Sequence, residues 1–113
     1  MNQLPEVIRT IERVSPDVVQ QAATFQAAIL ADVAGRRGTM HARVAPVHER
    51  MRLAGPAFTV EVRPGDNLMI HAAIALAQPG DILVIDGKGD QTAALMGTLM
   101  LSACKKRGLG GVI

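Results

Sequence analysis

The sequence predicts an α/β fold, with helices in its first third followed by a strand–helix–strand–helix–strand order. Two observations lead to this prediction. The first is an apolar stretch with a helix-start signal at residues 15–17 that continues to Val33. The second is that short apolar runs and helical stretches alternate from Ala57 onward, separated by Pro-Gly-Asp turns at 64–66 and 79–81. This order is typical of parallel strands joined by right-handed crossovers.

Length and composition indicate one globular domain. The chain has 113 residues, of which 49% are hydrophobic and 19% charged, so it carries enough apolar surface to fold. We treat residues 1–113 as a single domain, with 1–38 as an N-terminal helical segment. Only two aromatic residues occur, which argues against binding single-stranded nucleic acid by base stacking.

Charge and cysteine content narrow the class of protein further. The net charge of +2 is a mild excess of scattered residues, so we expect no nucleic-acid partner. Cys104 is the only cysteine, which excludes an intrachain disulfide and indicates a reducing compartment. The longest uncharged runs have 14 residues, whereas a membrane span needs about 20. We therefore expect a cytoplasmic protein with no membrane partner.

The N-terminal segment begins its helical part at Ser15, whose side chain caps free amides, with Pro16 and Asp17 in the first turn. Thr24 and Phe25 leave room for a break into two helices. Glycines at positions 35 and 38 end the apolar pattern. Residues 39–55 are expected to connect this segment to the sheet, with one short strand at about 42–45.

The first strand of the sheet is expected over Ala57–Arg63. Phe58, Val60 and Val62 point to one face of this run, and Ala57, Thr59 and Glu61 point to the other. The alternation predicts a strand with one buried face.

Later elements follow from similar signals. A helix is expected over Leu68–Ala77, with Asp66 or Asn67 as its cap. Ile82–Ile85 is wholly apolar, which predicts a strand buried on both faces. After a glycine-containing loop, a second helix ends at the basic residues 105–107, and Gly111–Ile113 opens a third strand. Because strands usually run five or six residues, we expect an N-terminal fragment of a longer protein, truncated within its sheet.

Few residues suit metal or nucleophilic chemistry. His41, His48 and His71 lie on different expected elements without a second ligand at metal-binding spacing, so we interpret them as surface or partly buried residues. Cys104 follows an apolar run and is interpreted as a buried structural thiol. Gly87–Thr92 matches only part of the dinucleotide fingerprint, because the third glycine is replaced and the expected acid is missing.

Gly97 lies inside a stretch with helical spacing, where glycine costs about 1 kcal/mol relative to alanine. One interpretation is a close packing contact at Gly97. The other is that the helix begins near Gly97, so that the first-turn amides of Thr98, Leu99 and Met100 are free to hold a small carboxylate. The residues alone leave both interpretations open.

Acidic residues offer one further candidate. Asp32 lies within an otherwise uncharged stretch, so it marks either a solvated helix face or a site carboxylate. Asp66, Asp81 and Asp90 each lie at a Pro/Gly turn, and turn chemistry explains them.

Several motifs together carry a family resemblance over about residues 20–113. They are Leu53-Ala54-Gly55-Pro56-Ala57-Phe58-Thr59-Val60, Pro64-Gly65-Asp66-Asn67, Pro79-Gly80-Asp81-Ile82-Leu83-Val84 and Gly108-Leu109-Gly110-Gly111-Val112-Ile113. The chain resembles the class II pyruvate aldolases that cleave 4-hydroxy-4-methyl-2-oxoglutarate and 4-carboxy-4-hydroxy-2-oxoadipate. These enzymes share a fold with the RraA-type regulators of ribonuclease E. The resemblance implies an RraA-like swivelling β/β/α domain, assembled as a homotrimer or hexamer with active sites between subunits.

The resemblance also implies a chemistry. In such aldolases a divalent metal, Mg²⁺ or Mn²⁺, chelates a 2-oxo acid substrate and stabilises the enolate formed on cleavage to pyruvate, with oxaloacetate decarboxylation as a side activity. Gly97-Thr98-Leu99-Met100 matches the segment that binds the pyruvyl part through backbone amides, which favours the carboxylate interpretation of Gly97. Some members carry an acid where this chain has Thr98. Asp32 aligns with a helix carboxylate that acts near a neighbouring subunit's site, where some members have the longer glutamate.

One part of the family pattern is absent. The family's Arg-Asp pair, which clamps the substrate and anchors the metal, follows soon after the Gly-Val-Ile strand and would lie beyond Ile113. We therefore expect no metal ligand in this chain and weak or no activity from the 113 residues alone. The alternative is a non-catalytic regulator that binds and inhibits ribonuclease E. The motif at 64–67 and the long N-terminal helical part favour the aldolases.

Overall fold

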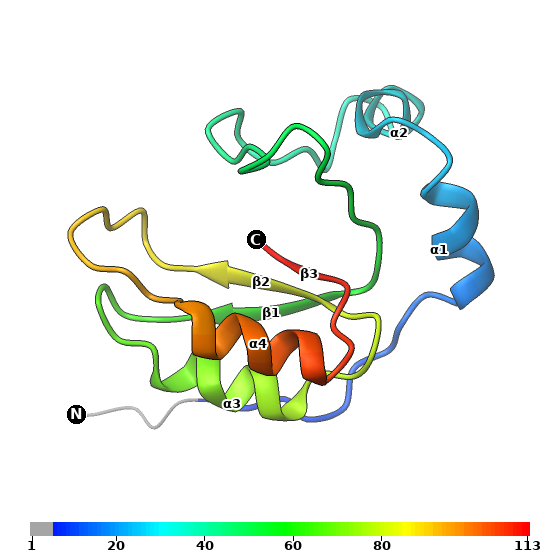
Figure 1. The fold of residues 1–113 in the computed structure, drawn as a ribbon. Coiled ribbons are helices and arrows are strands. Elements are labelled where there is room, and N and C mark those ends of the chain that lie inside the picture. The colour runs from blue at the N-terminus through cyan, green and yellow to red at the C-terminus, as the bar shows by residue number, and fades with distance from the viewer. Residues whose placement is uncertain (1–5) are drawn as a thin grey trace.

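The computed structural model describes residues 6–113 and has the element order that the sequence predicts (Figure 1). In chain order the elements are α1 (Pro16–Ala22), α2 (Ala27–Val33), β1 (Ala57–Glu61), α3 (Leu68–Leu76), β2 (Ile82–Asp86), α4 (Thr98–Lys106) and β3 (Gly111–Val112). The three strands are parallel and lie in the order β1-β2-β3. Helices α3 and α4 lie side by side against one face of this sheet.

The core lies between that sheet face and the two helices. The run expected as the first strand alternates as predicted, with Phe58 and Val62 buried and Val60 half-buried, although β1 itself ends at Glu61. Phe58 pairs in register with Leu83 of β2, which is fully buried. The buried core cluster consists of Phe58, Val62, Ile70, Ala73, Ile74, Ala77, Leu83, Met100 and Cys104. Burial of these apolar side chains is the main favourable contribution to folding.

The prediction that β2 is buried on both faces is wrong for the second half of the strand. Ile82 and Leu83 are buried, whereas Val84 and Ile85 are only half-buried. Among the described residues, helices pack on one face only. Val84 follows the buried Leu83 in the strand and therefore lies on the other face. β2 is therefore fully buried only at its first two residues, although its sequence is apolar as far as Ile85.

The N-terminal helices form as expected. The Ser15 hydroxyl accepts a hydrogen bond from the amide of Val18 at 3.4 Å, and Pro16 opens α1. α1 ends at Ala22 and α2 begins at Ala27, which confirms the break around Thr24. Neither helix contains a buried residue, and both stand away from the sheet (Figure 1).

The prediction of a short strand at about residues 42–45 is wrong. The amide of Arg43 donates to Nδ1 of His41 at 3.1 Å, and the amide of Val44 donates to the His41 carbonyl at 2.9 Å. Both amides are thus used within a tight turn, so they do not pair with a neighbouring strand.

Within residues 6–113 no helix is long and apolar enough to cross a membrane.

A buried ion pair joins the N-terminal segment to the start of β2. Asp81 is 0% exposed, and its two carboxylate oxygens accept hydrogen bonds from Nε and Nη2 of Arg13, each at 2.7 Å. The amide of Gln78 donates to the same carboxylate at 2.8 Å. Hydrogen bonds from Arg13 hold the pKa of Asp81 below its ordinary value, against the opposing effect of burial and with a smaller contribution from Gln78.

The variant Asp81→Asn tests this contact. It keeps the shape of the side chain but removes its charge and one acceptor oxygen, so we expect the free energy of unfolding to fall by about 1.5–3 kcal/mol, the range for hydrogen bonds to charged groups. Urea denaturation measures the change. Asp66→Asn, at an exposed turn, is the control and should lower the free energy of unfolding much less.

The same pair predicts a pH dependence. Because the folded-state pKa of Asp81 is depressed, its contribution is complete above the unfolded pKa of about 3.9 and is lost as pH falls through the folded value. The difference in unfolding free energy between the wild type and Asp81→Asn should therefore shrink as pH falls below about 4. A difference that stays constant from neutral pH down to acid unfolding would contradict this account.

Candidate active site

Parallel strands place their carboxyl ends at one edge of a sheet, and ligands of open α/β sheets bind at that edge. β1 and β2 end there, at Glu61 and Asp86, and the segments 62–67 and 87–97 follow them. These segments contact each other, because Nδ2 of Asn67 donates to the Leu95 carbonyl at 3.3 Å and contacts Sδ of Met100 at 3.7 Å. Asn67 thus joins the loop after β1 to the first turn of α4.

The first turn of α4 presents backbone donors. Gly97 is its N-cap, with extended backbone (φ −142°, ψ −175°) and no side-chain cap. The first helical hydrogen bond runs from the Leu101 amide to the Gly97 carbonyl at 3.0 Å. The three preceding amides, those of residues 98–100, donate to no other described residue. Three such amides at the positive end of a helix form a binding site suited to a small carboxylate.

The surroundings of Gly97 decide between the two interpretations of that residue. A Cβ placed at Gly97 would meet nothing within 4 Å, so no close packing contact requires glycine there. The helix begins at Thr98, with residues 93–96 in the loop, as the carboxylate interpretation expects. Leu99 is 86% exposed, whereas Met100 is buried and anchors the turn on the core. The first turn of α4 is therefore open to solvent at Leu99 and is held against the core by Met100.

A charged network lies at the same edge of the sheet. Lys88 Nζ contacts Glu61 at 2.8 Å and Asp86 at 3.2 Å, which joins the ends of β1 and β2. Hydrogen bonds to both carboxylates, led by Glu61, raise the pKa of Lys88. Hydrogen bonds from the Lys88 amide and ammonium lower the pKa of Asp86. Lys88 has a φ of +63°, and the Asp86 carboxylate stabilises this left-handed conformation by accepting from its amide at 2.9 Å.

Comparisons with known proteins identify the family of this chain. Residues 15–113 match the family described as RraA-like: Aldolase/RraA. This chain belongs to the RraA-like family. Two relatives carry the name "Putative 4-hydroxy-4-methyl-2-oxoglutarate aldolase". The protein from Halalkalibacterium halodurans is 35% identical over 97 residues, which cover 86% of this chain and 46% of the relative. The protein from Burkholderia multivorans is 31% identical over 80 residues, which cover 71% and 48%. The chain thus spans about half the length of these relatives.

The structure does not bring all the candidate residues of this RraA-like chain together. Gly97, Thr98, Leu99 and Met100 lie consecutively at the start of α4, with Met100 buried in the core. Asp32 lies exposed on α2, away from α4 (Figure 1). A role for Asp32 near a neighbouring subunit's site therefore stays a prediction.

The described residues contain no group of three or more His, Cys, Asp or Glu side chains that would hold a metal ion. His41 and His48 each accept a backbone hydrogen bond through Nδ1, and both are exposed, as is His71. Cys104 is buried, and burial raises the pKa of its thiol, which agrees with a structural role. The dinucleotide interpretation of Gly87–Thr92 is excluded, because that loop does not open a helix and α4 begins only at Thr98.

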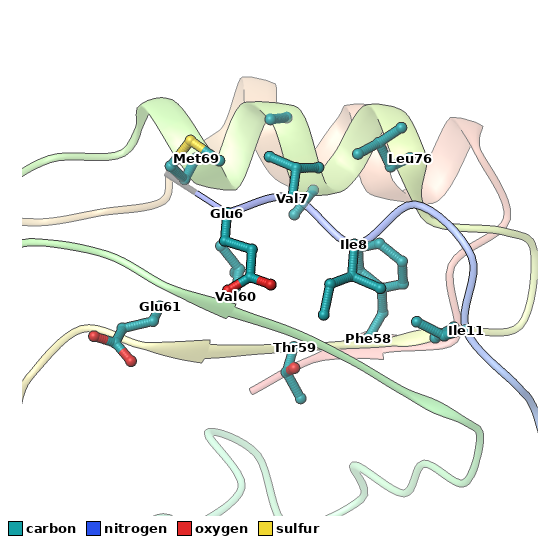
Figure 2. Close-up of a pocket in the computed structure, with 12 residues that line it drawn as sticks. Glu6, Val7, Ile8, Ile11, Phe58, Thr59, Val60, Glu61, Met69 and Leu76 are labelled. Carbon is teal, nitrogen blue, oxygen red and sulfur yellow. The ribbon is translucent and has the colours of Figure 1, made fainter. Parts of the chain in front are cut away.

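A groove of about 450 Å³ lies elsewhere, between the N-terminal segment, β1 and α3 (Figure 2). Val7, Ile8, Phe58, Val60 and Met69 are among its apolar lining residues, and Glu6 and Glu61 are its carboxylates. None of the predicted site residues lines it. Sequence reasoning missed this groove and also Asn67 and Lys88 as members of the carboxyl-edge site. The signal that could have found them is that Asn67 and Lys88 lie in the loops that follow β1 and β2.

The variant Thr98→Pro tests the amide site. Proline removes one of the three donors, yet it suits the first position of a helix and the extended backbone of Gly97 before it. We expect affinity for pyruvate to fall about tenfold, the equivalent of one hydrogen bond to a charged group. Isothermal titration calorimetry measures the affinity.

The matched control is Leu99→Ala, which keeps the amide and removes a side chain that is 86% exposed. It should bind pyruvate as the wild type does. Equal affinities for the wild type and Thr98→Pro, with circular dichroism showing both folded, would contradict the amide site.

Proposed function

We propose that the protein to which this chain belongs is a lyase that cleaves 4-hydroxy-4-methyl-2-oxoglutarate and related 2-oxo acids to pyruvate, with oxaloacetate decarboxylation as a side activity. The observation that carries the proposal is the first turn of α4, where three adjacent amides are free of described partners and open to solvent. A carboxylate is the ligand that such a turn favours. The names of both relatives support the same substrate class.

In this proposal the chain binds and orients the substrate. The amides of Thr98, Leu99 and Met100 hold the carboxylate next to the 2-oxo group, while burial of the Met100 side chain keeps the turn in place. The hydrogen bonds of Asn67 hold the loop after β1 against this turn. Fixed donors of this kind lose little entropy when the substrate binds.

The reaction class calls for a divalent cation, Mg²⁺ or Mn²⁺, whose chemistry is to polarise the 2-oxo group and stabilise an enolate. Among residues 6–113 there is no group of three or more His, Cys, Asp or Glu side chains that could hold this cation. The cation and its protein ligands are therefore part of the proposal.

Assembly into a homotrimer or hexamer is part of the same proposal. α1 and α2 have no buried residues; Val33 of α2 is 84% exposed, and Phe25 in the connection between the helices is 52% exposed. In the assembly, α1 and α2 would bury this apolar surface against a neighbouring subunit. Such packing would bring Asp32 toward a neighbouring site, where its carboxylate would serve the reaction.

Pyruvate release from 4-hydroxy-4-methyl-2-oxoglutarate tests the proposal, measured with a coupled lactate dehydrogenase assay. A protein that contains these 113 residues together with the Arg-Asp pair of the family pattern should release pyruvate with Mg²⁺ or Mn²⁺ and lose this activity with a chelator. The 113-residue chain should be weak or inactive.

Two outcomes would contradict the proposal. One is a longer protein, containing the Arg-Asp pair, that releases no pyruvate with either metal. The other is a rate that stays unchanged after chelation.

A further inference from the structure

The outer edge of β1 has no part in the site described so far. β1 is an outermost strand, since the sheet has the order β1-β2-β3. At its two ends the Pro56 carbonyl accepts from the Ile82 amide at 2.7 Å, and the Val62 amide donates to the Asp86 carbonyl at 3.0 Å. Alternate residues of a strand bond to the same neighbour, so the even-numbered residues of β1 bond to β2.

The odd-numbered residues of β1 therefore direct their backbone groups away from the sheet. These residues are Ala57, Thr59 and Glu61, and all three are exposed. Their amides and carbonyls make no hydrogen bond to any other residue in the range 6–113. An edge of this kind is a template on which a further strand can pair.

The groove of about 450 Å³ lies along this edge (Figure 2). Thr59 and Glu61 line it from β1, and Glu6, Val7 and Ile8 line it from the N-terminal segment. Most of its lining residues are apolar, and Glu6 makes no ion pair within the described part of the chain. A strand added to β1 would thus place its side chains in an apolar groove that also carries carboxylates.

A segment of complementary charge lies between two matching turns. In each turn, at residues 41–43 and 48–50, a histidine Nδ1 accepts from a backbone amide at 3.1 Å. The stretch Val44–Val47 between these turns is exposed and belongs to no helix or strand. Residues 36–52 around it contain five arginines and one glutamate. None of these arginines forms an ion pair with a carboxylate of the described chain.

The backbone of this stretch suits pairing along one side. The Val44 amide donates to the His41 carbonyl at 2.9 Å, and Pro46 has no amide hydrogen. The amides and carbonyls of Ala45 and Val47, by contrast, bond to no other described residue. Because alternate residues of a strand bond to the same neighbour, Ala45 and Val47 can pair with β1 while Pro46 faces away.

The segment lies away from the groove of its own chain. Figure 1 shows residues 36–52 on the opposite side of the sheet from α3 and α4. The groove, in contrast, has α3 as one wall, through Met69 and Leu76. Within its own chain the segment instead reaches the turn after β2, where Nη2 of Arg43 lies 3.8 Å from the Cβ position at Gly89. A second copy of the chain is therefore the source that would supply this segment to the groove.

We propose that Val44–Val47 of one copy of this chain adds as a strand to the outer edge of β1 in a second copy. Val47, which is 94% exposed in the single chain, enters the apolar groove. The arginines around it face the carboxylates of Glu6 and Glu61, and this charge complementarity favours the segment as occupant. The inference rests on the assembly included in the proposed function and names surfaces for it. Because the two surfaces differ, repeated contacts close into a ring where the rotation permits.

Two variants of the 113-residue chain test the two surfaces separately. Thr59→Pro removes an amide that points away from β2, at a position where an edge strand tolerates proline. Val47→Asp places a charge on a side chain that is 94% exposed, so the fold of the single chain should not change. Sedimentation velocity over a range of concentrations should show that the wild type self-associates. Each variant should raise the dissociation constant by about tenfold or more, and circular dichroism should show both folded.

Thr59→Val is the matched control, because it changes the side chain and keeps the amide. It should associate as the wild type does. If the proline variant is unfolded, Glu6→Arg takes its place, since it reverses an exposed charge in the groove and should weaken association in the same way.

Mixing the two variants is the sharpest test. Each copy of Thr59→Pro keeps an intact Val44–Val47 stretch, and each copy of Val47→Asp keeps an intact β1 edge. An equimolar mixture should therefore form one-to-one dimers with the affinity of a single wild-type contact, although neither variant associates well by itself. A mixture that associates no better than the separate variants would overturn the inference, and is the result expected if two β1 edges paired with each other. Variants that self-associate as the wild type does would overturn it as well.

Failure of this inference is distinct from failure of the proposed function. If the wild type is monomeric at every concentration, the contact is wrong, and pyruvate release by the longer protein with the Arg-Asp pair still decides the chemistry. If the mixed variants recover association but that longer protein releases no pyruvate, the contact stands and the proposed chemistry is wrong.

Discussion

The buried carboxylate of Asp81 is the contact on which the rest of the structure depends. It joins Arg13 of the N-terminal segment to the turn before β2, across 68 positions of sequence. Backbone hydrogen bonds then attach the segments beside the other two strands to that turn. The Gly80 amide donates to the Gly108 carbonyl at 2.9 Å, and the Gly110 amide donates to the Asp81 carbonyl at 2.8 Å. The Ile82 amide donates to the Pro56 carbonyl at 2.7 Å. Gly55 lies in close contact with the Gly80 carbonyl, which leaves no room for a side chain. The amino ends of all three strands are therefore fixed around one turn.

The register between β1 and β2 determines where the loops at their carboxyl ends lie. Because Ala57 pairs with Ile82 and Glu61 with Asp86, β1 and β2 end at the same level. The loops after them are thereby held together, which lets Lys88 join Glu61 to Asp86 and lets Asn67 reach the first turn of α4. The proposed carboxylate site is thus a consequence of strand pairing, and its donors belong to the backbone. Side-chain substitutions at Thr98 and Leu99 leave such donors in place, with proline as the exception.

Local signals in the sequence predicted most of the elements. The cap at Ser15 and the alternation over 57–63 each depend on neighbours a few residues away, and the structure agrees with both. For Gly97 the residues alone left two interpretations open, and the empty space around it argues against a close packing contact. Contacts between distant residues were not predictable in this way. The Arg13–Asp81 pair and the joining of strand ends by Lys88 depend on the folded arrangement. The turn at His41 was missed because its side chain uses an amide that strand pairing would otherwise take. Half-burial of Val84 was missed because an apolar run does not show which faces are covered.

The central claim is that the start of α4 binds the carboxylate of a 2-oxo acid. The most direct measurement is a crystal structure of this chain soaked with pyruvate. The account predicts carboxylate oxygens within hydrogen-bond distance of the amides of Thr98, Leu99 and Met100. Pyruvate bound instead in the groove beside Ile8 and Phe58, with the α4 amides facing only solvent, would contradict it.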